Sequence, residues 1–165
     1  MRTLLIRAGT WILAISLLLA AAARAEAAGE SNEGIFTLNP IGTVQKKDGR
    51  ATLLLHPDAV PGLLGLEEFS HVWVLWWFDR NDTPQQRSIL QVHPRGNRKN
   101  PLTGVFATRA PVRPNLIGMT LCRINSVTNN VVEVDGIDAF DGTPILDLKP
   151  FTIGNDRPQD PLAFP

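Results

Sequence analysis

Short apolar runs, rather than long amphipathic stretches, dominate the hydropathy pattern of this chain. The runs are rich in β-favouring residues and are separated by turn-forming residues, and no segment keeps the 3.6-residue apolar period of an α-helix. Many short strands with turns between them indicate a β-barrel or a β-sandwich. The predicted strands are residues 36–44, 51–56, 71–78, 89–92, 104–108, 119–127, 131–134 and 145–148.

Local signals define some of these elements further. Residues 53–55 are three consecutive leucines, as in a strand buried on both sides, and residues 71–78 (HVWVLWWF) predict a central strand. An Asn-Asn pair at 129–130 indicates a hairpin, and Asp-Gly pairs at 135–136 and 141–142 indicate turns.

Residues 57–69 predict a short helix between the second and third strands. Asp58 is a candidate N-cap, because its carboxylate can accept a hydrogen bond from a backbone N–H of the first turn. Leu63, Leu64 and Leu66 are expected to face the core.

Residues 1–25 predict a secretory signal peptide. Residues 1–7 carry two arginines and no acid, residues 11–23 are apolar except for Ser16, and Ala-x-Ala exits follow. The alternative is an uncleaved anchor, but this apolar run is shorter than the roughly 20 residues that a membrane span needs. We therefore expect cleavage, no stable membrane span afterwards, and export to the periplasm or the cell exterior. Cell fractionation checks this expectation, and a protein found only in the cytoplasm would contradict it.

The rest of the chain is expected to form one domain, since its length suits one domain and leaves little room for two. We expect a linker at residues 26–34, a β-barrel domain with short helices at residues 35–153, and a polar, proline-rich tail at residues 154–165. Cys122 is the only cysteine, so the core and not an intrachain disulfide must stabilise the fold.

Charge is unevenly distributed along the chain. Loss of residues 1–25 removes three of the 16 basic residues and none of the 16 acidic ones, which leaves 13 against 16 and a formal charge of −3. That balance excludes a strongly basic nucleic-acid binder overall. A local basic cluster with Asp82 as its one acid nevertheless predicts a surface for an anionic or nucleotide-like partner, or else a solvated arginine-rich loop. The cluster comprises Arg80, Arg87, Arg95, Arg98, Lys99, Arg109 and Arg113.

Several common motifs are absent from the sequence. It has no GxGxxG or GxxxxGK[ST] phosphate loop, no GxSxG elbow, no HExxH and no CxxC. His56, His71 and His93 do not share a metal-ligand spacing, so we expect no metal site. The residues alone assign no catalytic group.

A set of polar residues lies in a short, proline-rich part of the chain, and prolines stiffen the loops that carry it. Stiff loops with charged side chains suit a preorganised pocket. The alternative is a salt-bridged barrel rim, in which Arg109 or Arg113 pairs with a carboxylate of residues 138–141. The set comprises Thr108, Arg109, Arg113, Asn115, Asp138, Asp141, Thr143, Asp147 and Lys149.

Four motifs together resemble the TrmO family, also called TsaA-like. They are EEFSHVWVLWWF at 67–78, HPRG at 93–96, GVFATRAPVRPNLIGMTL at 104–121 and GIDAFDGTPILDLKPF at 136–151, in the order of that family. The resemblance implies a small, closed or nearly closed β-barrel that forms a homodimer and binds S-adenosyl-L-methionine in a mode unlike that of Rossmann methyltransferases. It also implies methylation of N6 of a threonylcarbamoyl-modified adenosine beside the tRNA anticodon. The expected partner is therefore tRNA or another adenosine-containing acceptor.

The resemblance assigns roles to residues of the matching motifs. The arginine of GVFATR is Arg109, and Met119 follows the family's RPNPIG motif, in which Leu116 replaces the usual proline. Residues 138–144 match the motif D-x-x-D-G-T-P. The cofactor-binding residues implied in this way are Arg109, Met119, Asp138, Ala139, Phe140, Asp141, Asp79 and Arg80, and the substrate-binding residues are Arg113, Asn115 and Arg95.

Two departures from the family pattern accompany the predicted export. Residues 44–50 pass almost directly between two strands, where relatives carry a longer Pro-Arg-Gln loop that contributes to cofactor binding. Asp79-Arg80 stand where the family usually has a histidine. The sequence thus predicts an S-adenosylmethionine-dependent methyltransferase. Its alternative is an exported, non-catalytic binding module that reuses the barrel to hold a nucleoside or a small anionic ligand.

Overall fold

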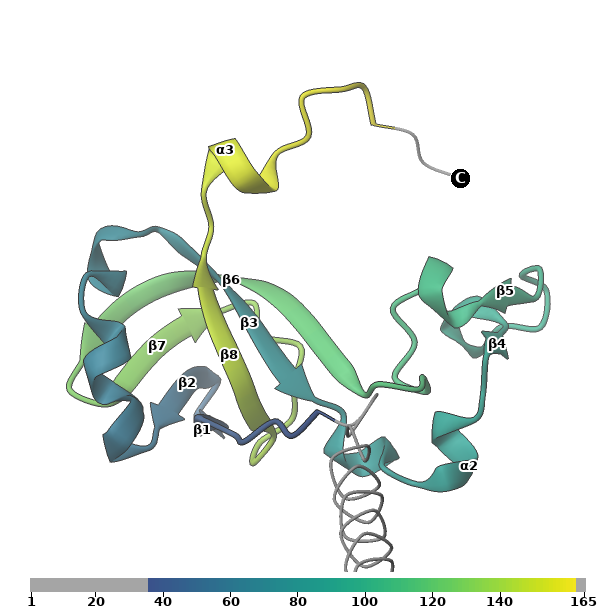
Figure 1. Cartoon of the computed structure of the whole chain (residues 1–165), viewed down its shortest axis with the longest axis horizontal. Coiled ribbons are helices and arrows are strands. Elements are labelled where there is room, and N and C mark those ends of the chain that lie inside the picture. The colour runs from purple at the N-terminus through teal and green to yellow at the C-terminus, as the bar shows by residue number, and fades with distance from the viewer. Residues whose placement is uncertain (1–35, 163–165) are drawn as a thin grey trace, which may run out of the picture. The chain divides into compact units, whose positions relative to one another are not determined.

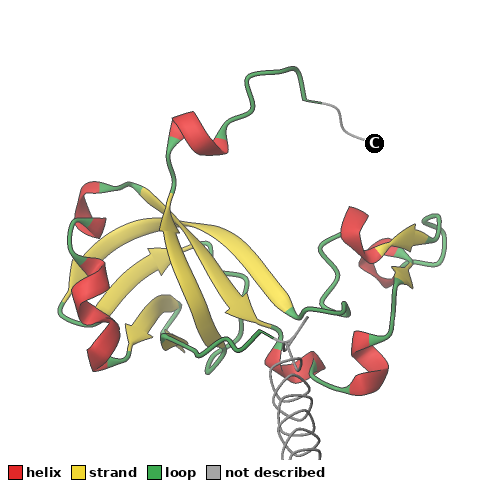
Figure 2. Ribbon diagram, in the orientation of Figure 1, coloured by secondary structure: helices red, strands yellow, loops and turns green. Residues whose placement is uncertain are grey.

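The computed structural model of the chain describes residues 36–162. The predicted signal peptide and linker lie outside the described residues, as do the last three residues of the tail. Strands joined by short helical turns make up the described part (Figures 1 and 2). The strands are β1 (Gly42–Lys47), β2 (Arg50–Leu55), β3 (His71–Trp77), β4 (Gln91–Val92), β5 (Thr103–Gly104), β6 (Ile117–Thr128), β7 (Val131–Asp135) and β8 (Pro144–Pro150). The α-helices are α2 (Pro84–Arg87) and α3 (Ile153–Asp156), and the 3₁₀ turns are η1 (Pro57–Leu63), η2 (Leu66–Glu68), η3 (Asp79–Asn81), η4 (Pro94–Gly96) and η5 (Val105–Ala107).

Six strands form one closed antiparallel barrel with the order β1-β2-β7-β6-β3-β8. β4 and β5 pair with each other in a separate two-stranded sheet, within the long connection from β3 to β6 (Figure 1). Closure pairs the two edges that an open sheet would leave exposed. The predicted all-β barrel with short helices is therefore confirmed.

Side chains alternate between the inside and the outside of the barrel wall. On β3 the even-numbered residues 72–76 are buried and the odd-numbered residues are half-buried. On β2, Leu53 and Leu55 are buried, whereas Leu54 between them is half-buried. The predicted burial of β2 on both sides is wrong, because a barrel wall has a single inner face.

Two tight hairpins join neighbouring strands of the barrel. Asp48 (φ 51°) and Gly49 (φ 78°) connect β1 to β2, and two successive positive φ angles are the geometry that two-residue hairpins favour. Asn129 (φ 53°) begins the turn from β6 to β7, which confirms the hairpin predicted there. The connection from β1 to β2 is thus a two-residue turn rather than a long loop.

Some predicted strand boundaries are wrong. β1 begins at Gly42 rather than at residue 36, and Pro40 lies just before it, where a residue without an N–H cannot join a strand ladder. Of the predicted strand at residues 104–108, only Gly104 is in a strand, because the chain turns into η5 at Val105, whose N–H donates to the carbonyl of Leu90.

The predicted helix at residues 57–69 is replaced by two 3₁₀ turns, η1 and η2, separated at Gly65 (φ 84°). Asp58 does not cap it, because the chain enters η1 at His56 without any side-chain cap. Leu63 and Leu66 are buried as predicted, but Leu64 is 92% exposed. Leu64 follows the end of η1 and precedes the left-handed Gly65, so it lies in neither turn.

The first turn of the predicted tail is attached to the outside of β3. The indole N–H of Trp73 donates to Oδ1 of Asp156 (2.9 Å), and Oδ2 of Asp156 accepts from the backbone N–H of Thr152 (2.7 Å). The ring of Phe151 lies 6.5 Å from those of both His71 and Trp73, between ring centroids. Asp156 therefore ties helix α3 to β3, and Figure 2 shows the helix beyond the C-terminal end of β8.

Candidate ligand site at the open edge of strand β6

The first half of β6 has a strand neighbour on one side only. Residues 117–123 pair with β3, whereas pairing with β7 begins at Arg123. An unpaired strand edge leaves backbone N–H and C=O groups available to other partners. A hollow of about 210 Å³ lies along this edge. Its lining residues are Trp76, Phe78, Thr108, Arg109, Arg113, Ile117, Gly118, Met119, Thr120 and Asp138.

Aromatic rings form one wall of the hollow. The Trp76 indole lies directly against Gly118, where an added Cβ would come within 2.5 Å of the ring. Its N–H donates to Oγ1 of Thr120 (3.1 Å), and the ring of Phe78 packs edge-on against it, with centroids 4.5 Å apart. Only glycine at 118 lets the indole approach this closely, so this wall is fixed by β3 and β6 together.

Two arginines provide positive charge. Nη1 of Arg109 donates to the carbonyl of Met119 (3.1 Å) on the open edge of β6, and Nη1 of Arg113 donates to the carbonyl of Ala110 (3.2 Å). A guanidinium has five N–H donors, so each arginine keeps further donors for an anionic ligand group.

The salt-bridged rim is not found. Among residues 36–162 the ion pairs are Arg87–Asp82 (2.7 Å) and Lys149–Asp147 (2.8 Å), and neither involves the two arginines of the hollow. Their charges are therefore available to a ligand rather than neutralised by the barrel.

The loop after β7 supplies the negative charge. Asp138 lines the hollow, while Ala139 and Thr143 are each 1% exposed and anchor the loop in the barrel. Oδ1 of Asp141 accepts from the backbone N–H of Lys46 (2.8 Å). The hydroxyl of Thr143 lies 3.4 Å from Oδ1 of Asp79, to which it donates. Nζ of Lys46 also donates to the carbonyl of Ile137 (3.1 Å), so contacts on both sides of Asp138 hold the loop.

An ion pair braces the entrance to β6. Nε of Arg87 donates to Asp82, whose other oxygen accepts from the Trp77 indole N–H (3.2 Å), and Nη1 of Arg87 donates to the carbonyl of Pro114 (3.0 Å). The hydrogen bond from the Arg87 guanidinium holds the pKa of the Asp82 carboxyl below its usual value. This brace ties α2 to the loop that carries Arg113.

The hollow brings together four of the residues that the sequence assigned to a site: Arg109, Arg113, Met119 and Asp138. The others are placed around it. Asp79, Arg80, Phe140 and Asp141 lie on the adjoining loops, where the Arg80 guanidinium sits 4.0 Å from the Phe140 ring centroid, and Ala139 is buried beneath them. The carbonyl of Asn115 accepts from Ile117 N–H (2.6 Å), and Arg95 lies in η4, away from the lining.

The sequence interpretation missed the aromatic wall. Trp76, Phe78 and Gly118 were assigned to a strand or a motif without a role in the site. The alternation along HVWVLWWF was the available signal, since it places Trp76 on the inner face, but the close approach to Gly118 depends on the β3–β6 register.

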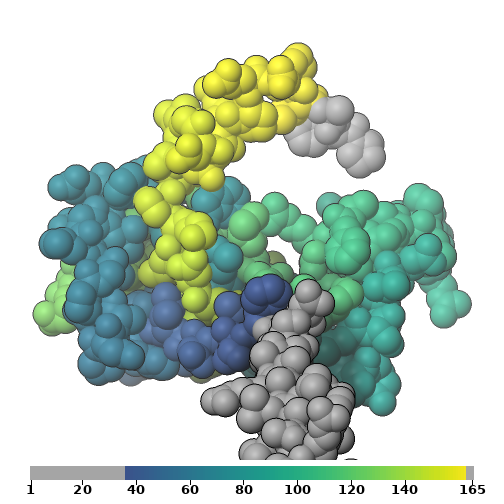
Figure 3. Space-filling model, in the orientation of Figure 1, coloured from purple at the N-terminus to yellow at the C-terminus, as the bar shows by residue number. Residues whose placement is uncertain are grey.

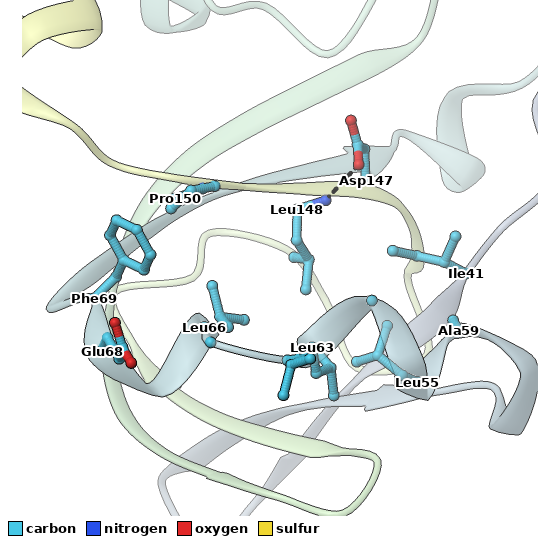
Figure 4. A pocket seen from close by; sticks show the side chains of 13 residues that line it. Ile41, Leu55, Ala59, Leu63, Leu66, Glu68, Phe69, Asp147, Leu148 and Pro150 are labelled. Atoms are coloured by element: carbon cyan, nitrogen blue, oxygen red, sulfur yellow. Dashed lines mark hydrogen bonds between the residues drawn. The ribbon is translucent and has the colours of Figure 1, made fainter.

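Two larger hollows occur among the described residues and differ in chemistry. The one in Figure 4, about 470 Å³, lies at the opposite end of β3 and is lined mainly by apolar side chains. Its charged lining residues are Glu68 and Asp147, and Asp147 is already paired with Lys149. The other, about 310 Å³, is an open depression beside the β1–β2 turn, with exposed charged side chains and no aromatic residue. Of these three hollows, only the β6-edge hollow combines basic and acidic side chains with an aromatic wall.

Two further observations concern residues 36–162. They contain no group of three or more His, Cys, Asp or Glu side chains arranged to hold a metal ion. None of the helices in this range is long and apolar enough to cross a membrane.

Comparison with known proteins gives consistent matches. The family described as "tRNA-methyltransferase O N-terminal domain" matches residues 31–157. A "probable S-adenosyl-L-methionine-binding protein" of Methanocaldococcus jannaschii is 44% identical over 125 residues, which are 76% of this chain and 99% of that protein. A tRNA (adenine(37)-N6)-methyltransferase of Mus musculus is 47% identical over 98 residues, 59% of this chain but 22% of that protein. The crystal structure of TrmO from Pseudomonas aeruginosa is 32% identical with a TM-score of 0.59, covering 78% of this chain and 61% of that one.

Substituting Gly118→Ala tests the aromatic wall. The added methyl group would overlap the Trp76 ring, so we expect a loss of about 1–3 kcal/mol in the free energy of unfolding. Thermal unfolding measures the loss, with Gly154→Ala as the matched control, because an added Cβ there meets nothing within 4 Å. Equal melting temperatures for the two variants would contradict the described packing.

Proposed function

The chain belongs to the tRNA-methyltransferase O N-terminal domain family, and on that premise we propose that it binds S-adenosyl-L-methionine at the β6-edge hollow and methylates an adenosine-containing RNA. The observation that carries the proposal is the joint presence of Arg109, Met119 and Asp138 in one hollow whose arginines have no carboxylate partner within residues 36–162. The relatives named for S-adenosyl-L-methionine binding support the same cofactor.

The donor set of the hollow suits this cofactor. Its amino-acid end carries a carboxylate and an ammonium group, and its sulfur carries a positive charge. Arg109 and Arg113 are matched to the carboxylate, because charge-assisted hydrogen bonds from guanidinium groups to carboxylates are strong. Asp138 is matched to one of the cationic groups, and the wall of Trp76 and Phe78 offers apolar surface for the uncharged parts.

Positioning is the main task of the protein in this chemistry. When bound, the cofactor supplies an electrophilic methyl group, and transfer needs an in-line approach of the acceptor nitrogen. A chain that holds both reactants in that geometry lowers the barrier without a metal ion. The fixed loop of Asp138 and the braced loop of Arg113 are the elements that hold such a geometry here.

The acceptor is inferred from the relatives. Rodent and human relatives are named tRNA (adenine(37)-N6)-methyltransferases, and we infer a tRNA adenosine for this chain. The chain spans about a fifth of the length of those relatives and about three fifths of the TrmO crystal chains, but nearly all of the archaeal relative from Methanocaldococcus. We therefore propose for this chain only the steps that the barrel can carry out, and not the full activity of the longer mammalian proteins.

Methyl transfer requires S-adenosylmethionine and RNA in the same compartment as the folded chain. Export, as residues 1–25 predict, would separate the chain from the cytoplasmic pools of both. The exported binding module is not favoured by the comparisons, whose named activities are cofactor binding and methyl transfer. The compartment in which the protein is found therefore decides which acceptor it meets.

The outer face of the barrel supports a homodimer. Leu75 on β3 and Ile117, Met119 and Leu121 on β6 lie side by side in the strand register and point outward, each of the last three at least 36% exposed. The 210 Å³ hollow is smaller than the roughly 300–1,000 Å³ of most ligand pockets, and its rim includes Ile117 and Met119. We propose that a second copy packs on this face and completes the enclosure of the cofactor.

Calorimetry with S-adenosyl-L-methionine tests the cofactor site. Arg109→Ala removes a charged donor to the cofactor carboxylate, and the affinity is expected to fall at least tenfold, since such bonds contribute about 1.5–3 kcal/mol. Arg157→Ala, which removes a cation from the far end of the chain, is the matched control and should bind as the unsubstituted chain does. Equal affinity of the Arg109→Ala variant would contradict the proposed site.

Light scattering tests the homodimer. The unsubstituted chain is expected to have twice the monomer mass, and Leu121→Lys, which places a charge on the apolar face, is expected to give monomers. Leu64→Lys, at a residue 92% exposed near the other end of the barrel, should leave the mass unchanged. A monomeric unsubstituted chain at high concentration would overturn the dimer.

A further inference from the structure

The connection from β3 to β6 carries a local excess of positive charge. Residues 83–116 contain six basic residues and no acidic one, although the whole chain has 16 of each. Among them, Arg87 alone has a carboxylate partner within residues 36–162, the neighbouring Asp82. Such a concentration of one sign attracts anionic partners and raises their association rate. The six are Arg87, Arg95, Arg98, Lys99, Arg109 and Arg113.

Three of these cations are presented by one compact loop, residues 93–100. Nδ1 of His93 is 2.8 Å from the carbonyl of Asn100, and the Asn100 side chain donates to the carbonyl of Pro94 (2.9 Å). The loop is thus closed by side-chain hydrogen bonds across its base. A closed loop that displays cations is partly preorganised for binding, because less backbone freedom remains to be lost.

Arg95, Arg98 and Lys99 are all exposed on this loop. Arg95 has φ 59°, a left-handed conformation that is uncommon for residues other than glycine. Strained backbone of this kind persists where surrounding contacts impose it and is concentrated at functional sites. These three side chains form no ion pair within residues 36–162, so their charges are accessible to an external anionic partner.

Large apolar side chains are exposed beside the cations. Phe106 is 79% exposed, and Leu90 and Leu102 are 57% and 56% exposed. Phe106 lies in η5 directly after Val105. Val105 is 1% exposed, and its N–H donates to the carbonyl of Leu90 (2.9 Å). The buried Val105 anchors the turn, and the phenyl ring next to it faces solvent.

We propose that residues 83–116, named here the basic lobe, form an RNA-binding arm for the single-stranded part of the acceptor, with phosphates at Arg95, Arg98 and Lys99 and a base stacked on Phe106. Single-stranded nucleic acids are bound by this combination of cations and exposed aromatic rings. Figure 3 shows the lobe, in teal to green, as a projection of the folded unit. The proposal rests on the proposed function, because RNA is its acceptor.

The lobe is directly connected to the methyl-transfer site. Phe106 precedes Arg109 by three residues, at most about 10 Å of extended chain. A base on Phe106 would therefore lie within one or two nucleotides of a reacting adenosine at the β6 edge. The same connection thus holds the cofactor with one end and guides the acceptor with the rest.

The test measures binding of a fluorescein-labelled RNA hairpin with a single-stranded loop to the full chain across a range of salt concentrations. The triple variant Arg95→Asn, Arg98→Gln, Lys99→Gln is expected to flatten the slope of log K against log salt by about 2, at about 0.7 per lost phosphate contact. Phe106→Ala is expected to weaken binding about tenfold at constant slope, and Phe106→Trp to restore it. Asparagine at 95 keeps the left-handed backbone accessible.

The matched control removes three cations elsewhere, by Lys47→Gln, Arg50→Gln and Arg157→Gln. It should leave the slope near that of the unsubstituted chain, and an equal loss in the control and in the lobe triple would overturn the lobe as the RNA arm. Calorimetry with S-adenosyl-L-methionine separates the two proposals. A chain that binds cofactor but no RNA contradicts the lobe, whereas a chain that binds RNA through the lobe but no cofactor contradicts the methyltransferase.

Discussion

Strand β6 changes partner at Arg123: it pairs with β3 from Ile117 to Arg123 and with β7 from Arg123 to Thr128, and the proposed site depends on the edge that β7 leaves open along the first half. Where β7 ends, the Met119 carbonyl is free to accept from Arg109, and the following loop is free to bring Asp138 to the same edge. Full pairing along β6 would fill this edge with another strand. The closed barrel is therefore the support for a site formed where the pairing between β6 and β7 is incomplete.

The long connection from β3 to β6 carries both the arginines of the proposed cofactor site and the cations of the proposed RNA-binding lobe. It leaves the barrel at Phe78, forms the basic lobe, and returns at Leu116 after passing Arg109 and Arg113. The Arg87–Asp82 pair and the hydrogen bond to Pro114 stiffen its two ends near the barrel. Under the proposed assignment, this one segment would position both the cofactor and the acceptor.

The sequence predicted the barrel and several turns because these depend on local signals. Alternating apolar positions give β3 its inner face, and the Asn-Asn pair at 129–130 gives the β6–β7 hairpin. The same signals could not distinguish an α-helix from 3₁₀ turns at residues 57–69, and so misplaced Leu64. The charged residues of the site were predicted from motifs, but Trp76 was not, since its contact with Gly118 arises from strand register rather than from either sequence neighbourhood.

Transfer of a radiolabelled methyl group from S-adenosyl-L-methionine to tRNA tests the central claim most directly. The chain, purified from a host and incubated with tRNA that lacks the methyl group, is predicted to label an adenosine, and nuclease digestion with chromatography should place the label on its N6 nitrogen. Cofactor binding without any labelled nucleoside would contradict the claim and would leave a barrel that holds the cofactor without using it.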